Sequence, residues 1–277
     1  MNTHTGHSGP EILIAPEHRL ITLTGAGGKT SLSRWLASHL QLIPRRVIIT
    51  TTTKILPLPG MTTILHEDGP DFLGRIRRAL DQSPSIMVAS RFDPATGKII
   101  GLDKDIITFM HKSRLADTIL VEADGAARKP LKAPNWREPV IPAGTDLCIG
   151  IMGLDAAYRP LTESNVHRHE IFSQITSLRP SEKITPAHMT RIAMAPNGLF
   201  KGCPPDCELS VFLNKTDIPE GKELTEEFNS TVTRNGQASF IKWFAGSTQE
   251  RRMIQIGQYA QASRIFSSTR LAFSHQL

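Results

Sequence analysis

A cluster of glycines followed by a lysine and two hydroxyl residues is the first feature of this sequence that could carry chemistry. Three glycines in four positions let a backbone turn tightly and point successive N–H groups into one concavity. Such amides can hold phosphates, while Lys29 adds a positive charge and the Thr30 hydroxyl can ligate Mg²⁺. The pattern predicts a phosphate-binding loop made of Gly25, Ala26, Gly27, Gly28, Lys29, Thr30 and Ser31.

The residues on either side of this loop favour the same interpretation. The apolar run Leu20–Leu23 predicts a buried strand, and the spacing of apolar residues after Lys29 predicts a helix. The loop is shorter than a standard Walker A loop, which has a glycine where this chain has Leu23. It resembles the short loops of Mur-type ligases and of the MinD-like class, although the MinD-like signature lysine is replaced by Thr24. The alternative is an ordinary glycine turn with a solvated lysine.

Two acidic residues follow an apolar run further along the chain. The segment Thr118–Gly125 reads TILVEADG, a predicted buried strand that ends in Glu122 and Asp124. Side chains two residues apart on a strand point the same way, so both acids can face one site. An acid in this place can hold Mg²⁺ or orient a water molecule, whereas the alternative is a surface turn. We therefore expect Glu122 and Asp124 to be metal-binding and catalytic residues, together with Thr30 and Lys29.

Three cations come directly after these acids. Arg128, Lys129 and Lys132 lie in a segment that its prolines keep from forming a helix. They could neutralise phosphate charge or bind an anionic substrate, and a solvated basic loop is the alternative. Because they are nearest to the acids in sequence, Arg128 and Lys129 are the expected ligand-binding residues.

Four threonines end another predicted strand. Val47–Ile49 is apolar and β-branched, and it leads into Thr50–Thr53. The carboxyl ends of strands are where α/β sheets bind ligands, so these hydroxyls could contact Mg²⁺, a phosphate or an attacking water. Thr52 is the candidate catalytic member, and a polar strand end without a function is the alternative.

An N-K-x-D sequence follows a predicted strand at Glu208–Leu213. It consists of Asn214, Lys215 and Asp217, the guanine-selecting pattern of GTP-binding proteins. A carboxylate at Asp217 can accept both hydrogen bonds that the guanine edge offers and adenine does not. Asn214 would brace the loop, and the Lys215 stem would cover the base. Asn and Asp also favour plain turns at strand ends, which is the alternative.

Two weaker patterns are left open. A helix expected from Val166 onward would place His167 and Glu170 on one face, where a metal pair is conceivable but a polar helix face is favoured. Cys203 and Cys207 flank a short loop, and a second ligand pair that a structural zinc would need is absent nearby in the sequence.

Alternating strands and helices must position these residues. The sequence predicts a three-layer α/β fold of the P-loop NTPase type, with a mostly parallel central sheet and a β-hairpin insertion at Phe92–Ile100. Residues 1–17 are expected to be a flexible N-terminal leader, and residues 18–277 one domain. Further predicted elements are helices at 72–80, 103–112, 224–232 and 253–266, a helix that starts at 185–186, and strands at 86–89, 146–153 and 240–244.

Composition restricts the class of protein. The 277 residues are 39% hydrophobic and carry a formal charge of +6, and no apolar run reaches the roughly 20 residues that span a bilayer. The N-terminus lacks a basic region followed by an apolar core, and an odd number of cysteines, three, is unlike a disulfide framework. We therefore expect a cytoplasmic protein with no membrane partner. No Lys/Arg run indicates a nucleic-acid partner.

Taken together, these segments resemble the YqeC family of accessory proteins for selenium-dependent molybdenum hydroxylases. The resemblance rests on LTGAGGKTS, VIITTTTKI, ILVEADGAARKPLKAP, VHRHE and VFLNKTD, and covers residues 20–217. It implies a P-loop protein that acts in maturation of these hydroxylases or their cofactor, with a molybdenum hydroxylase or a molybdopterin-type cofactor as partner. The acids and the N-K-x-D sequence are also similar to those of metallochaperone GTPases, an analogy of fold.

Three functional hypotheses follow. The first is a Mg²⁺-dependent NTPase with GTP favoured over ATP, whose hydrolysis drives a conformational step on a partner. The second is a transferase or ligase that uses NTP to activate a small anionic cofactor or a selenium species. The third is a scaffold that binds nucleotide without turnover, since neither an arginine finger nor a water-positioning glutamine is identifiable from the sequence.

Overall fold

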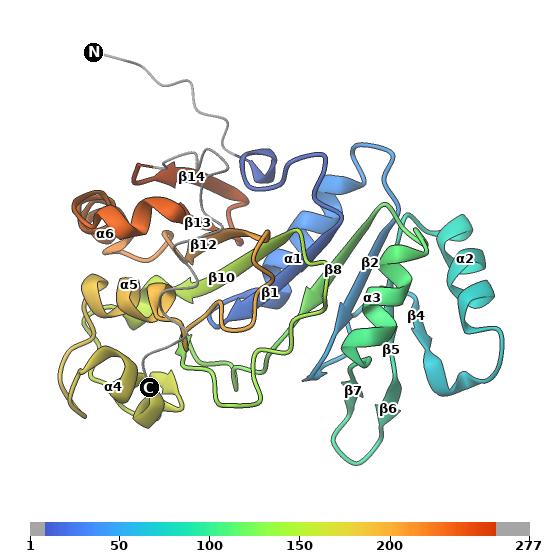
Figure 1. Cartoon of the computed structure of the whole chain (residues 1–277), viewed down its shortest axis with the longest axis horizontal. Helices are drawn as coiled ribbons and strands as arrows, with labels where there is room; N and C mark the ends of the chain where they lie inside the picture. The colour runs from blue at the N-terminus through green and yellow to red at the C-terminus, as the bar shows by residue number, and fades with distance from the viewer. Residues whose placement is uncertain (1–8, 259–277) are drawn as a thin grey trace.

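A nine-stranded sheet forms the centre of the protein. In the computed structural model, which describes residues 9–258, eight strands are parallel and the edge strand β14 is antiparallel to β13 (Figure 1). The order across the sheet is β14 (Arg252–Ile256), β13 (Lys242–Ser247), β12 (Glu208–Asn214), β10 (Leu147–Gly153), β1 (Leu20–Gly25), β8 (Thr118–Glu122), β2 (Val47–Thr51), β5 (Ser85–Ala89) and β4 (Thr63–Leu65).

Helices cover both faces of this sheet, which gives three layers. On one face α1 packs against alternate residues of β1, β2 and β10. On the other face α2 and α3 share a core with β2, β5 and β8, while α4, α5 and α6 share one with β10, β12 and β13. The bounds are α1 (Lys29–Leu40), α2 (Phe72–Gln82), α3 (Lys104–Lys112), α4 (His169–Thr176), α5 (Pro186–Met194) and α6 (Gly221–Arg234). The predicted three-layer α/β class is confirmed.

Two small sheets lie beside the large one. The predicted hairpin is confirmed as β6 (Arg91–Asp93) and β7 (Lys98–Ile100), and β7 also pairs with β3 (Lys54–Ile55). The second is a parallel pair, β9 (Leu131–Lys132) with β11 (Val166–His167). Four short 3₁₀ helices complete the described elements: η1 (Pro10–Ile12), η2 (His66–Asp68), η3 (Leu154–Ala156) and η4 (Gly236–Phe240).

Near the amino end, part of the expected leader packs onto the domain. Leu13 and Ile14 follow η1, are buried, and belong to the core cluster that contains α1. The packed part of the chain therefore includes residues that precede residue 18.

Three predicted elements have different bounds or types. Residues 252–256 form β14 rather than the start of a helix, because Met253 is buried against the sheet edge that β13 offers; the remainder of the predicted helix, from 259, lies outside the described residues. The last parallel strand begins at Lys242, after η4, and runs to Ser247. Helix α4 begins at His169, three residues later than expected.

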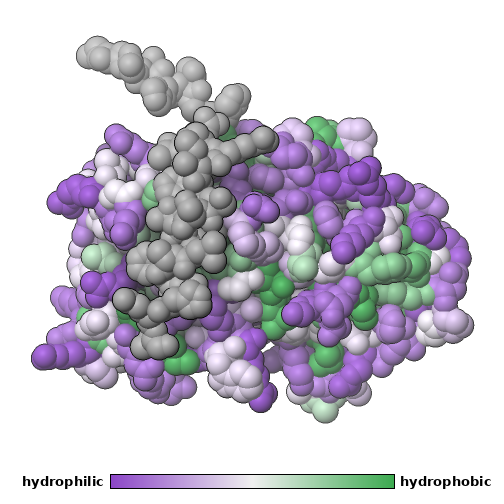
Figure 2. All heavy atoms as spheres, viewed as in Figure 1, coloured by the Kyte–Doolittle hydropathy of each residue, from purple (hydrophilic) through white to green (hydrophobic). Residues whose placement is uncertain are grey.

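No helix within residues 9–258 has the length and apolar character that crossing a membrane requires. In the view of Figure 2, hydrophilic side chains predominate on the surface, with hydrophobic groups between them.

Candidate nucleotide-binding site

The carboxyl ends of the parallel strands bring the predicted phosphate loop and the two acids together. Strand β1 ends at Gly25, α1 begins at Lys29, and β8, which pairs with β1, ends at Glu122. Gly27 has a φ of +85°, and a Cβ on it would lie 2.4 Å from the Gly153 nitrogen and 2.8 Å from the Pro130 oxygen. Only glycine allows this backbone to turn so close to its neighbours.

Five consecutive backbone amides of the loop lack an acceptor. Ala26 donates its N–H to the Ile151 carbonyl at 2.9 Å and is buried. Beyond it, the amides of Gly27 to Ser31 make no hydrogen bond to any residue between 9 and 258. The first amides of a helix have no partner within the helix, and the positive end of its dipole lies there. Thr30 and Ser31 are exposed, so this end of α1 is open to an anion from outside.

The Lys29 side chain folds back across the loop. It is 6% exposed, and its ammonium group donates to the Gly25 carbonyl at 2.5 Å. It also lies 3.1 Å from Asp124 Oδ1, an ion pair rather than an aligned hydrogen bond, since this oxygen has no hydrogen-bond partner among the described residues. The second carboxylate oxygen, Oδ2, accepts the Gly25 amide at 3.0 Å. Asp124 therefore holds both the start of the loop and its lysine.

Glu122 is bound differently from Asp124. It is 3% exposed, and its Oε1 has no hydrogen-bond partner within the described chain. Burial raises the pKa of Glu122 above its ordinary value, against the opposing effects of the Lys29 charge and a hydrogen bond with Thr30. A buried carboxyl with a free oxygen beside a threonine hydroxyl is a suitable donor set for a hard cation such as Mg²⁺. Both predicted acids thus lie at the loop, but in different environments.

Of the three predicted cations, the one most distant in sequence lies closest to the acids. Lys132 is fully buried, and its ammonium lies 3.0 Å from Asp124 Oδ2. Arg128 is exposed, and Lys129 lies 3.7 Å from Glu163. The backbone turns back through Ala127 and Arg128, which both have positive φ. The order of the three cations along the sequence therefore differs from the order of their distances to Asp124. The position of Lys132 between buried Leu131 and Ala133 is the signal that could have identified it.

Lys132 belongs to a network of ion pairs in which positive and negative side chains alternate. Its ammonium also contacts Glu138 Oε2 at 2.8 Å, and the Arg168 guanidinium contacts the same oxygen at 2.7 Å. Burial by itself raises the pKa of Glu138, but hydrogen bonds from Arg168 and Lys132 outweigh it and lower that pKa to about 2. Lys201 donates to the Asn135 carbonyl in the same region.

The N-K-x-D residues follow β12 and one of them contacts the phosphate loop directly. The Asn214 amide donates to the Gly27 carbonyl at 2.8 Å, and its oxygen accepts the Thr248 amide at 3.0 Å. Lys215 has a φ of +74° and pairs with Asp155 at 2.6 Å. Asp217 is exposed. Asn214 braces the loop, as the sequence pattern indicates, and Asp217 is accessible from solvent.

The four threonines lie at the end of β2 beside Glu122. Thr51 Oγ1 donates to the Glu122 carbonyl at 2.9 Å, and the Thr52 amide donates to the same carbonyl at 3.0 Å. The Thr52 hydroxyl donates to the Val140 carbonyl at 3.0 Å. These contacts hold the end of β2 against the end of β8, and the hydroxyl proton of Thr52 is used in its hydrogen bond to Val140.

His167 and Glu170 do not share a helix face. His167 belongs to β11, where it pairs with Lys132 of β9, and α4 begins only at His169 because Arg168 has a positive φ of 61°. The proposed pairing of His167 with Glu170 by helical spacing is therefore wrong. In residues 9–258, no group of three or more His, Cys, Asp or Glu side chains is arranged to hold a metal ion by itself.

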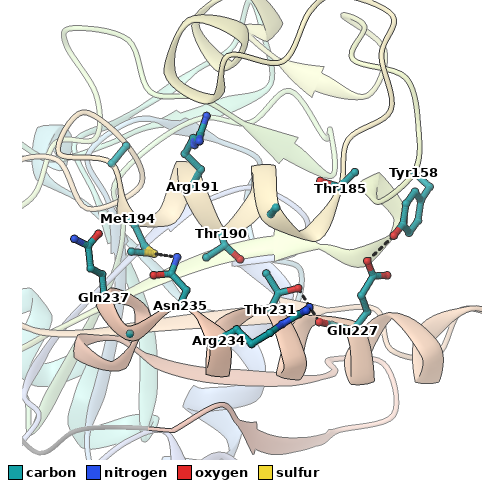
Figure 3. A pocket seen from close by; sticks show the side chains of 13 residues that line it. Tyr158, Thr185, Thr190, Arg191, Met194, Glu227, Thr231, Arg234, Asn235 and Gln237 are labelled. Carbon is teal, nitrogen blue, oxygen red and sulfur yellow. Dashed lines mark hydrogen bonds between the residues drawn. The ribbon is translucent and has the colours of Figure 1, made fainter.

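A separate cavity of about 1060 Å³ lies between α5 and α6 (Figure 3). Thr190 of α5 faces Arg234 and Glu227 of α6 across it, whereas the Arg191 side chain points away from α6 and donates to the Thr176 carbonyl, and Tyr158 donates to Glu227 at one end. None of the phosphate-loop, acid or N-K-x-D residues lines this cavity.

Two comparisons with known proteins identify the family of this chain. The sequence model for the family described as YqeC protein matches residues 21–170, which include the phosphate loop, both acids and the Lys132 network but not Asn214. The uncharacterized protein YqeC of Escherichia coli (strain K12) is 34% identical over 197 residues, or 71% of this chain and 75% of that protein. This chain therefore belongs to the YqeC family.

Proposed function

We propose that this protein binds a Mg²⁺–nucleoside triphosphate at the loop Gly25–Ser31, prefers GTP, and hydrolyses it. The observation that carries the proposal is the run of five backbone amides, Gly27 to Ser31, that have no acceptor within residues 9–258 and stand at the start of α1. Amides arranged in this way bind phosphate oxygens, and the helix dipole adds to the attraction. Lys29 supplies the point charge for the terminal phosphates.

Glu122 and Thr30 are the residues that would hold Mg²⁺. The support is the buried Glu122 oxygen, which has no hydrogen-bond partner in the part of the chain that the structure describes, and the neighbouring threonine hydroxyl. When bound, Mg²⁺ supplies positive charge that neutralises the phosphate oxygens. Burial disfavours the charged form of Glu122 in the protein alone, and a cation beside it favours that form again.

The preference for guanine rests on Asp217. Its exposed carboxylate follows Asn214, which is anchored on the phosphate loop, so a base bound beside the loop lies within reach of this segment. Guanine offers two donors that the Asp217 carboxylate can accept. Adenine does not offer this pair, so with adenine the carboxylate would be left unsatisfied and binding would be weaker.

Titration calorimetry of GTP and ATP with Mg²⁺ tests this proposal. Wild type is expected to bind GTP at least tenfold more tightly than ATP, and Asp217→Ala to lose that preference by weakening GTP alone. Glu226→Ala, an exposed acid of α6, is the matched control. Equal affinities for the two nucleotides, unchanged in Asp217→Ala, would refute the guanine assignment, and absence of binding to either would refute the proposal as a whole.

As the cellular role we propose an accessory step in the maturation of selenium-dependent molybdenum hydroxylases or their cofactor. The support is the resemblance of the sequence to the YqeC family. Single-turnover hydrolysis measured with and without such a hydroxylase tests it, and a rate that rises with the hydroxylase is expected. Absence of turnover under both conditions would instead favour the nucleotide-binding scaffold.

One observation favours a transferase or ligase as the second candidate. Arg128 is exposed, has a φ of 59°, and makes no ion pair or hydrogen bond with any residue in the described part of the chain. A cation held at the loop after the acids is suited to bind a second, anionic substrate. A covalent product formed from GTP or ATP and a molybdopterin-type compound would support this candidate, and release of nucleoside diphosphate and phosphate alone would contradict it.

A further inference from the structure

Asp124 is the centre of the charges beneath the phosphate loop. One carboxylate oxygen lies 3.1 Å from the Lys29 ammonium, and the other lies 3.0 Å from both the Lys132 ammonium and the Gly25 amide. The carboxylate is 2% exposed. Two cations therefore share one buried anion, and only one of them belongs to the phosphate loop.

Lys132 is buried among three protein partners. An ammonium group has three hydrogens to donate. Lys132 donates two of them, to the Gly125 carbonyl at 2.6 Å and the Glu138 carboxylate at 2.8 Å, and its ammonium also forms an ion pair of 3.0 Å with Asp124. The side chain is fully buried. Its role is therefore to hold other residues rather than to contact a phosphate.

Lys29 has a different position in this network. Its ammonium cannot serve the terminal phosphates while it remains on the Gly25 carbonyl and Asp124. Movement of Lys29 to a phosphate removes one cation from a buried carboxylate, and a buried charge without a partner is strongly unfavourable. Asp124 then keeps Lys132 and the Gly25 amide, so its charge stays compensated.

We propose that Lys132 is a positioning residue for phosphate binding, which keeps Asp124 compensated so that Lys29 can leave it for the terminal phosphate. The inference rests on the proposed nucleotide binding. The two acids then have different roles. Asp124 pairs with Lys29 before nucleotide binds, and Glu122, whose Oε1 has no hydrogen-bond partner among residues 9–258, is the acid at the metal. Glu138 and Arg168 hold Lys132 from the other side through the shared Glu138 oxygen.

The test compares binding of a non-hydrolysable GTP analogue, with Mg²⁺, to the full chain and its variants. Lys132→Met removes the charge and keeps the volume, and we expect its affinity to be at least tenfold weaker. Adding Asp124→Asn removes the anion that Lys132 compensates, and we expect the double variant to bind at least fivefold more tightly than Lys132→Met. Asp124→Asn alone completes the cycle that isolates the coupling.

Lys242→Met is the matched control. Lys242 forms a half-buried ion pair of 2.8 Å with Glu208 and begins β13, so it lies at the amino end of the parallel strands, whereas the phosphate loop follows the carboxyl end of β1. Its removal is expected to leave the affinity for the analogue within twofold of wild type.

A spectroscopic measurement separates positioning from mere support of the fold. Nitrogen-15 NMR of lysine side chains follows each ammonium group. In wild type the Lys29 signal is expected to shift when the analogue binds, while the Lys132 signal stays in place. In Lys132→Met the Lys29 shift at saturating analogue is expected to be smaller.

Each outcome bears on a stated part of the argument. Wild-type binding with equal affinity in Lys132→Met overturns this inference and leaves the proposed function standing. Failure of Asp124→Asn to restore affinity, or unfolding of both the single and the double variant, also overturns it, since Lys132 would then be a structural residue. Absence of binding by wild type overturns the proposed function and this inference with it.

Discussion

The side-chain amide of Asn214 donates a 2.8 Å hydrogen bond to the carbonyl of Gly27, although the two residues are 187 positions apart in the sequence. The other end of the same amide group accepts the backbone N–H of Thr248 at 3.0 Å. One side chain thus joins the phosphate loop, the end of β12 and the segment after β13. Residues that could recognise a base are thereby fixed relative to residues that could bind phosphates.

Asn214→Ala is expected to weaken binding of GTP and of ATP by a similar factor, at least tenfold. The reason is that the Gly27 carbonyl and the Thr248 amide both lose their partner, so the loop is no longer held in one place. Titration calorimetry with each nucleotide measures this. A loss confined to GTP would contradict the bracing role and would give Asn214 the base-selecting role that is proposed for Asp217.

Lys29→Met is expected to weaken nucleotide binding at least tenfold while costing little stability. The phosphates lose their point charge, but Asp124 keeps the Lys132 ammonium at 3.0 Å and the Gly25 amide at 3.0 Å. Calorimetry gives the affinity, and urea denaturation gives the free energy of unfolding, which should fall by less than about 2 kcal/mol. A larger loss of stability with unchanged affinity would show that Lys29 serves the fold instead.

Glu138→Gln is expected to destabilise the protein at pH 7 and to make it less sensitive to acid. The carboxyl has its pKa lowered from 4.5 to about 2 in the folded protein, so its contribution is full above pH 4.5 and is lost as the pH falls toward 2. At 1.36 kcal/mol for each tenfold change in proton affinity, this contribution is at most about 3 kcal/mol.

Urea denaturation of wild type and Glu138→Gln at a series of pH values from 7 to 3 measures this effect. The difference in the free energy of unfolding should shrink below pH 4.5. Glu163→Gln is the control, because the Glu163 side chain is 83% exposed and such surface ion pairs contribute little. A difference for Glu138→Gln that stays constant down to pH 3 would contradict the assigned linkage.

Gly27→Ala is expected to lower the free energy of unfolding by more than about 2 kcal/mol, the sum of a strained backbone and a steric clash. The φ of Gly27 is +85°, and a Cβ would lie 2.4 Å from the Gly153 nitrogen. Gly97→Ala separates the two causes: its φ is +63°, but a Cβ would meet nothing within 4 Å, so only about 1 kcal/mol of backbone strain is expected. Equal losses in the two variants, measured by urea denaturation, would show that the close approach to Gly153 has no energetic consequence.

Local patterns predicted most of the regular structure. The apolar periodicity of α1, α2 and α6 and the β-branched runs of β1, β2 and β8 gave the correct elements, since each needs only its own residues to define a buried face. The strand β14 was predicted as the start of a helix. Its pairing with β13 is a contact between segments, and periodicity over four residues could not reveal it.

The sequence by itself determined where the glycine loop, the two acids at the end of β8 and the N-K-x-D residues lie in the chain, because each is a short pattern of neighbouring residues, and their binding of a nucleotide stays a prediction. Only the tertiary structure decided which cation serves the acids. Lys132 reaches Asp124 because the backbone reverses at Ala127 and Arg128 and buries Leu131 and Ala133 on either side of it. A buried charge needs an opposite charge close to it in the folded protein. Distance along the chain does not reveal which residue that is.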